Sequence, residues 1–170
     1  MFEEFMGIPA HPLVVHAAVV FVPLLALLTI GYALVAPIRP HTRWVLGLLA
    51  VGAPVAALLA KLSGDAFFAR MRAANRVTPE FVPTLETHRD FGNDTLWAAI
   101  ALAIVALALV RFVSPKAAAT TAAGAGATDG RPGRALTLTL QVLSLVAAAI
   151  AVYYVIRTGD SGAKAVWTGQ

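Results

Sequence analysis

Three histidines and one aspartate are the residues of this chain best suited to bind a ligand. His11, His16, His88 and Asp160 carry imidazole or carboxylate groups, and imidazole nitrogens bind transition metals and haem iron. The chain contains no cysteine, so histidine and carboxylates are its strong metal ligands. We interpret these four residues as a ligand-binding site in which His16 and His88 hold a metal. Asp160 does not bind the metal itself but orients one of the imidazoles.

His16 is the most distinctive of the four because it lies within an apolar run, between Val15 and Ala17. An ionisable side chain inside a membrane segment indicates a functional site. The alternative is a neutral imidazole that hydrogen-bonds a neighbouring helix. His11 precedes Pro12, and its alternative role is a helix cap or a solvated side chain.

Catalytic motifs do not accompany these residues. The sequence contains no HExxH, CxxCH or GxSxG pattern and no phosphate-binding loop. A hydrolase that uses a metal-activated water ranks last among the hypotheses because no motif places a general base. We therefore predict no catalytic residue and do not favour an enzyme.

The overall composition is that of an integral membrane protein. Of the 170 residues, 59% are hydrophobic and 13% are charged, and the mean hydropathy of +0.77 is too high for an ordinary soluble domain. The formal net charge is +4, but the basic residues flank apolar runs and form no patch. We therefore expect the lipid bilayer as the environment and no nucleic acid as a partner.

Four apolar runs are long enough to cross a hydrocarbon core about 30 Å thick. They predict an all-α, integral membrane four-helix bundle that forms a single domain over residues 1–170. Gly64 and Gly159 are expected to end the second and fourth helices, and a capping box at 87–90 is expected to open the third. Residues 65–83 are either a short helix in the membrane interface or a polar linker. The predicted helices are 12–36, 43–63, 88–113 and 135–157, with a flexible linker at 117–134.

Four crossings place both termini on one side of the membrane. The same side then holds the starts of the first and third helices and the ends of the second and fourth. The four candidate residues therefore converge there. No Lys or Arg precedes the first helix, whereas Arg39 and Arg43 follow it, so we predict that this side faces away from the cytoplasm.

Three segments of the chain resemble one bacterial family. They are H-P-L-V-V-H-A-A-V-V-F-V-P-L at 11–24, H-R-D-F-G at 88–92 and T-G-D-S-G-A-K-A-V-W at 158–167. The chain resembles the family called domain of unknown function 2231 (DUF2231), in its actinobacterial form, over its whole length. The resemblance implies a four-helix protein of the bacterial inner membrane and does not supply an activity. Many relatives carry a histidine in the place of Asp160.

Binding is the leading functional hypothesis. The chain is predicted to be a binding or accessory protein with a His/Asp-lined pocket on the extracytoplasmic side, and haem or a transition metal is the candidate cofactor. One alternative is a small proton-coupled transporter in which Pro23 and Pro54 kink helices along a pathway. Another is a purely structural membrane protein. Besides the bilayer, a second membrane protein or another copy of this chain is the candidate partner.

Overall fold

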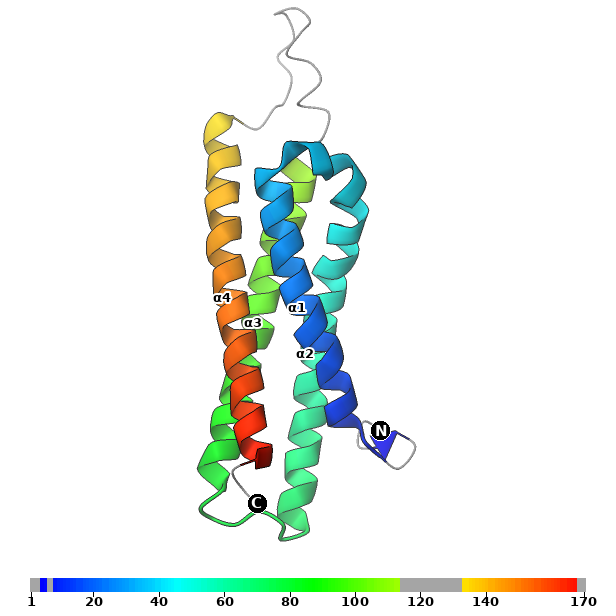
Figure 1. The fold of residues 1–170 in the computed structure, drawn as a ribbon, viewed down its shortest axis with the longest axis vertical. Coiled ribbons are helices and arrows are strands. Elements are labelled where there is room, and N and C mark those ends of the chain that lie inside the picture. Colours follow the sequence, from blue (N-terminus) through cyan, green and yellow to red (C-terminus); the bar gives the residue numbers. More distant parts are fainter. Residues whose placement is uncertain (1–3, 6–7, 114–132, 168–170) are drawn as a thin grey trace, which may run out of the picture.

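The computed structural model of the protein describes residues 4–5, 8–113 and 133–167, which form a helical bundle and one short strand pair (Figure 1). Nearly all of the predicted linker 117–134 lies outside the described residues. The strands β1 (Glu4–Phe5) and β2 (Ile8–Pro9) pair in antiparallel orientation. The helices are α1 (Ala10–Leu34), η1 (Ala36–Ile38), α2 (Arg39–Ala73), α3 (Val82–Phe112) and α4 (Arg134–Trp167).

All four α-helices are long and apolar enough to cross a membrane. Stretches without Asp, Glu, Lys or Arg account for this: all of α1, residues 44–60 of α2, 95–110 of α3 and 135–156 of α4. An α-helix also satisfies its backbone hydrogen bonds within the segment, which lipid requires. The predicted four-helix membrane bundle is therefore confirmed.

The helices run alternately up and down and surround one common core (Figure 1). α1 and α3 each pack against both α2 and α4, and they face one another diagonally across the bundle. Many of the buried positions are alanines, which let helix backbones approach closely. The most deeply buried core residues include Leu25, Leu46, Ala53, Ala99, Leu102 and Ala148.

Three helices extend further than the sequence predicts, all at the same end of the bundle. α2 continues through Gly64 to Ala73, and α4 continues through Gly159 to Trp167, so neither glycine ends a helix. α3 begins at Val82, ahead of the predicted capping box. Packing against neighbouring helices stabilises these extra turns, whereas glycine ends a helix most readily where such packing is lacking. Of the segment 65–83 predicted as an interfacial helix or linker, residues 65–73 are the last part of α2, and residues 74–81 connect α2 to α3.

At the other end of the bundle, polar contacts link the end of α1 to α2, to α4 and to the residue that follows α3. Arg39 donates from Nε to the carbonyl of Tyr32 at 2.8 Å and from Nη2 to the carbonyl of Ala33 at 2.8 Å. Gln141 of α4 donates to the same Ala33 carbonyl at 2.8 Å. The hydroxyl of the fully buried Tyr32 donates to the carbonyl of Val113 beyond α3 at 3.3 Å. These contacts occupy carbonyls that the helix end leaves without an intrahelical partner.

Candidate functional site

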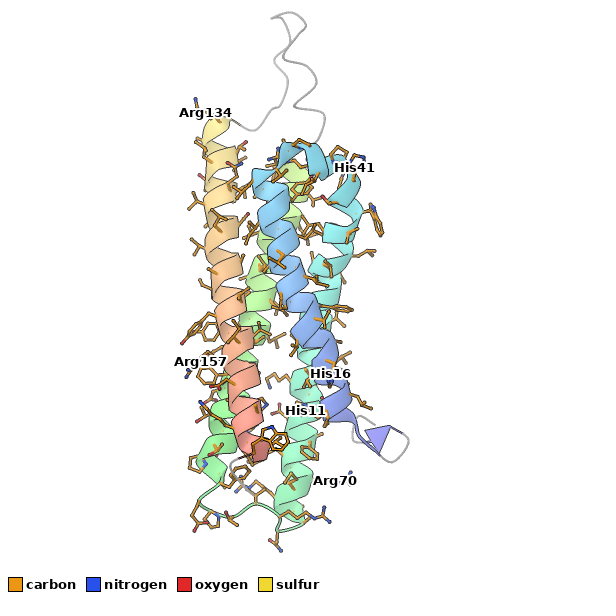
Figure 2. All side chains as sticks on the ribbon, viewed as in Figure 1. His11, His16, His41, Arg70, Arg134 and Arg157 are labelled. Atoms are coloured by element: carbon orange, nitrogen blue, oxygen red, sulfur yellow. The ribbon has the colours of Figure 1, made fainter. Side chains whose placement is uncertain are left out.

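Ionisable residues gather at the end of the bundle that holds both termini. Figure 2 places His11, His16 and Arg70 towards this end, and His41 and Arg134 at the opposite end. α2 has 35 residues, and at 1.5 Å per residue it spans about 52 Å, well beyond a hydrocarbon core of about 30 Å. The longer helices therefore exceed the thickness of a hydrocarbon core, and their charged residues lie outside their uncharged stretches.

His11 and His88 face one another across the bundle. Their ring centroids are 6.3 Å apart, and the ring planes are inclined by 74°. His11 lies at the start of α1, and His88 lies within α3, so two diagonal helices each contribute one imidazole. Both side chains are half-buried. The structure thus brings together two of the residues that the sequence analysis predicts as ligands.

The ring of His11 is held by α2. Its Nδ1 lies 3.0 Å from the carbonyl oxygen of Ala60 and 3.2 Å from Oγ of Ser63. Ser63 donates its own proton to the Ala60 carbonyl at 2.9 Å. Because a carbonyl can only accept, Nδ1 must carry the ring proton, which leaves Nε2 with a lone pair. Phe67 stacks on the ring, with the centroids 6.4 Å apart and the planes inclined by 17°.

The ring of His88 is held in the same way by α4. Its Nδ1 lies 3.0 Å from Oγ of Ser161, and Ser161 donates to the carbonyl of Thr158 at 3.0 Å. The imidazole also has a hydrogen bond with the backbone of Thr158; because a carbonyl can only accept, Nδ1 of His88 is the donor, and Nε2 again holds the lone pair. The Thr158 hydroxyl also lies 2.7 Å from that of Thr95, which joins α4 to α3.

A glycine follows each of these serines and lies against the imidazole. A Cβ added to Gly64 would lie 2.9 Å from Cε1 of His11, and one added to Gly162 would lie 2.9 Å from Cε1 of His88. Sequence reasoning treated Gly64 as a helix end and missed both serines and Gly162 as parts of the site. A signal was available, because the Ser-Gly dipeptide occurs twice in the chain, once after the second apolar run and once after the fourth.

A charge network lies beside the histidine pair. Asp65 of α2 accepts from Lys61 at 2.8 Å and from Arg89 of α3 at 2.9 Å. The guanidinium of Arg89 also lies over the ring of Phe68, 5.1 Å from its centroid. Through these contacts the end of α2 is attached to the start of α3, next to His88.

His16 and Asp160 have other partners than this histidine pair. His16 is exposed, and its Nδ1 lies 2.6 Å from the carbonyl oxygen of Pro12 on its own helix. Asp160 is exposed and pairs with Lys164 at 2.8 Å. The imidazole that faces His88 is that of His11, and the metal role of His16 stays a prediction.

Asp160 borders a shallow groove between α3 and α4. The groove has a volume of about 190 Å³ and includes Ser161, the partner of His88. Arg157 lies on its wall, with the guanidinium 4.8 Å from the ring centroid of Phe91. Among the described residues, no group of three or more His, Cys, Asp or Glu is placed to hold a metal ion.

The chemistry available at this end is therefore that of two neutral imidazoles whose Nε2 atoms can each bind a metal centre. Ser63 and Ser161 are buried, and their protons go to backbone carbonyls. Neither hydroxyl is activated by a base, so the serines orient the imidazoles and are not placed as nucleophiles.

Comparison with known proteins assigns the chain to a family. A family model described as a predicted membrane protein, DUF2231, matches residues 7–170. No curated protein and no solved structure matches the chain.

Proposed function

The chain belongs to the DUF2231 family of predicted membrane proteins, and we propose that it is a binding protein that holds one transition-metal centre between His11 and His88. The observation that carries this proposal is the pair of imidazoles from diagonal helices, 6.3 Å apart. The centre is a free metal ion or the iron of a haem, since both are bound by imidazole nitrogen.

The separation of the two rings supports a shared metal. A metal lies roughly 2.0–2.1 Å from each ligating imidazole nitrogen, so two rings on opposite sides of one metal have centroids roughly 6 Å apart. The observed centroid distance is 6.3 Å. The separation of the two rings therefore matches that of two imidazoles bound to one metal.

The hydrogen bonds of the rings give further support. Metal-binding histidines commonly donate their second ring N–H to a carbonyl or another acceptor, which fixes the tautomer and the orientation of the ring. His11 and His88 have such partners at Nδ1, namely Ser63 with the Ala60 carbonyl and Ser161. Nε2 is consequently the ligating atom on both sides.

The small number of protein ligands indicates that the metal centre carries further ligands of its own. Structural zinc sites use four protein ligands, and the described residues provide two imidazoles and no further group of His, Cys, Asp or Glu at metal-binding spacing. Haem iron already has four ring nitrogens and needs only axial ligands from the protein. A bound iron or copper would supply reversible one-electron chemistry, which suits an accessory protein in a redox setting.

The site is proposed to lie at the extracytoplasmic surface of the bacterial inner membrane. No Lys or Arg precedes α1, and Arg39 and Arg43 follow it, which favours an outward orientation of both termini. In this orientation the metal centre is accessible to periplasmic or extracellular partners, while the opposite end of the bundle faces the cytoplasm.

Metal and haem titrations test the proposal. The full-length protein is purified in mild detergent, its metal content is measured by mass spectrometry, and haemin, Cu²⁺ and Zn²⁺ are titrated separately with absorbance and calorimetry as readouts. We expect stoichiometric binding of at least one of these probes, lost in His11→Ala and in His88→Ala. His16→Ala is the matched control and should bind as the wild type does.

Two outcomes would contradict the proposal. One is a wild-type protein that binds none of the three probes. The other is binding that survives in the double variant His11→Ala, His88→Ala but is lost in His16→Ala. This result would place the site at His16, the residue that the sequence alone favours.

A further inference from the structure

Arg157 of α4 marks one end of an uncharged stretch that is about as long as a hydrocarbon core is thick. The stretch 135–156 lies between Arg134 and Arg157, and it spans about 33 Å at 1.5 Å per residue, close to the core thickness of about 30 Å. Figure 2 shows Arg134 at one end of α4 and Arg157 towards the other. A stretch of this length is expected to place Arg157 at the level of lipid headgroups.

Aromatic side chains support this level. Tyr153 and Tyr154 lie one turn before Arg157 on α4, and their ring centroids are 5.2 Å apart. Tyr153 is exposed, and so is Trp97 near the start of the uncharged stretch of α3. Tyrosine and tryptophan are enriched where the hydrocarbon meets the headgroups.

The groove between α3 and α4 begins at Arg157 and carries an excess of positive charge. Its volume is about 190 Å³, and two of its charged residues are positive and one is negative. The negative one, Asp160, is paired with Lys164 at 2.8 Å. α3 contributes Thr84, Thr87 and Phe91 to the groove, and α4 contributes Arg157, Asp160, Ser161 and Lys164.

The guanidinium of Arg157 is held in place while its hydrogen-bond donors are unused. It lies over the ring of Phe91, 4.8 Å from the centroid, and a contact with the face of a ring uses no N–H donor. Within the described part of the chain, the guanidinium has no hydrogen-bond acceptor and no ion-pair partner. The hydroxyl of the half-buried Thr84 has no hydrogen-bond partner there either.

We propose that this groove binds the phosphate of a membrane phospholipid and that Arg157 is its main ligand. The planar fork of a guanidinium can donate to two phosphate oxygens at once, and basic pockets between membrane helices commonly bind lipid headgroups. The excess of one positive charge matches the single negative charge of a phosphodiester. This inference goes beyond the proposed function and does not depend on a metal between His11 and His88.

The surface next to the groove favours a lipid over a free phosphate ion, which has the same oxygen atoms. On the membrane side of Arg157, both helices expose apolar or aromatic side chains, including Trp97 of α3 and Ile150 and Tyr153 of α4. The acyl chains of a lipid whose phosphate occupies the groove would lie against such side chains. A soluble phosphate gains nothing from them.

Native mass spectrometry of the full-length protein in detergent measures this binding. The probes are dioleoylphosphatidylglycerol and dioleoylglycerol, which lacks the phosphate; inorganic phosphate is titrated separately by calorimetry. We expect the wild type to bind phosphatidylglycerol about tenfold more tightly than dioleoylglycerol, and Arg157→Gln to lose this preference, because a hydrogen bond to a charged group contributes roughly that much.

Arg111→Gln is the matched control. Arg111 directly follows the uncharged stretch of α3, and its guanidinium lies 5.4 Å from the ring centroid of Phe112, so the variant removes the same charge from a similar setting outside the groove. It should bind phosphatidylglycerol as the wild type does. Circular dichroism establishes folding; if Arg157→Gln does not fold, Arg157→Lys replaces it and should bind less tightly than the wild type, because an ammonium lacks the planar fork.

Three results would overturn the inference. One is equal affinity of the wild type for phosphatidylglycerol and dioleoylglycerol, and another is an equal loss of affinity in Arg157→Gln and Arg111→Gln. The third is inorganic phosphate that binds through Arg157 while phosphatidylglycerol does not, which would make the ligand a soluble phosphate. Metal binding should be unchanged in Arg157→Gln, so this inference and the proposed function can fail separately.

Discussion

His11 lies so close to Gly64 that any side chain there would collide with the imidazole. A Cβ on Gly64 would lie 2.9 Å from Cε1 of His11, and the equivalent distance from Gly162 to Cε1 of His88 is also 2.9 Å. The close approach of ring and helix depends on the absence of a side chain at each glycine. These two contacts set the distance of each imidazole from the helix that holds it.

Alanine at either glycine should therefore weaken metal or haem binding. Gly64→Ala and Gly162→Ala displace the ring from its serine partner, and we expect a loss of roughly tenfold to a hundredfold in affinity, the range seen when groups that orient metal ligands are changed. The readout is the dissociation constant from the same titration as above.

Gly47→Ala is the control for these variants, because a Cβ at Gly47 meets nothing within 4 Å. It should leave affinity unchanged and raise helix stability by up to about 1 kcal/mol, the difference in helix propensity. Equal affinity losses in Gly47→Ala and Gly64→Ala would show that the effect does not come from the imidazole contact.

Removing the serine hydroxyls should also weaken binding, through the orientation of the rings. Ser63→Ala and Ser161→Ala each remove an acceptor for an Nδ1 proton, and we expect a decrease of about tenfold or more in affinity. Ser144→Ala is the matched control, since Ser144 is buried and, within the described part of the chain, donates to the Leu140 carbonyl of its own helix at 2.6 Å. Unchanged affinity in both site variants would contradict an orienting role for the serines.

Asp65→Asn should loosen the attachment of α2 to α3. The carboxylate binds Lys61 at 2.8 Å and Arg89 at 2.9 Å while its side chain is 32% exposed, so the variant should lose about 1 kcal/mol of unfolding free energy, the upper end for partly exposed ion pairs. Thermal unfolding in detergent, followed by circular dichroism, measures the change.

Asp160→Asn offers the comparison for this network. Its ion pair with Lys164 lies within α4 and is more exposed, so its loss should affect stability less than the loss of Asp65. If the two variants were equally destabilised, the link between helices would contribute nothing beyond a local ion pair.

Gln141→Leu tests the opposite end of the bundle. The variant removes the 2.8 Å hydrogen bond from α4 to the Ala33 carbonyl, while Arg39 still donates to that carbonyl. We expect a loss of about 0.6 kcal/mol and at most about 1.7 kcal/mol, the values for polar contacts between membrane helices. Ligand affinity should not change, because the site lies at the other end; a parallel loss of affinity would show that the two ends are coupled.

Sequence reasoning predicted the end of the molecule at which the histidines lie, but it paired His88 with His16, whereas the structure places His11 opposite His88. His11 and His16 are five residues apart, which corresponds to about 140° around a helix at 3.6 residues per turn. Only one of them can therefore face the core. The apolar residues around His16 suggested that it points inward, but the rotation of α1 set by packing turns His11 towards His88 and leaves His16 exposed.

The sequence by itself determined the four membrane-crossing helices, the family and the side on which the ionisable residues gather. The helices follow from hydropathy summed over neighbouring residues, the family follows from short sequence motifs, and the side follows from the even number of crossings. None of these requires knowledge of contacts between helices. The tertiary structure decided the length of the helices past the membrane, the pairing of His11 with His88 and the Ser-Gly supports at Ser63 and Ser161. These depend on how helices far apart in the sequence are rotated and packed, which only contacts between them can fix.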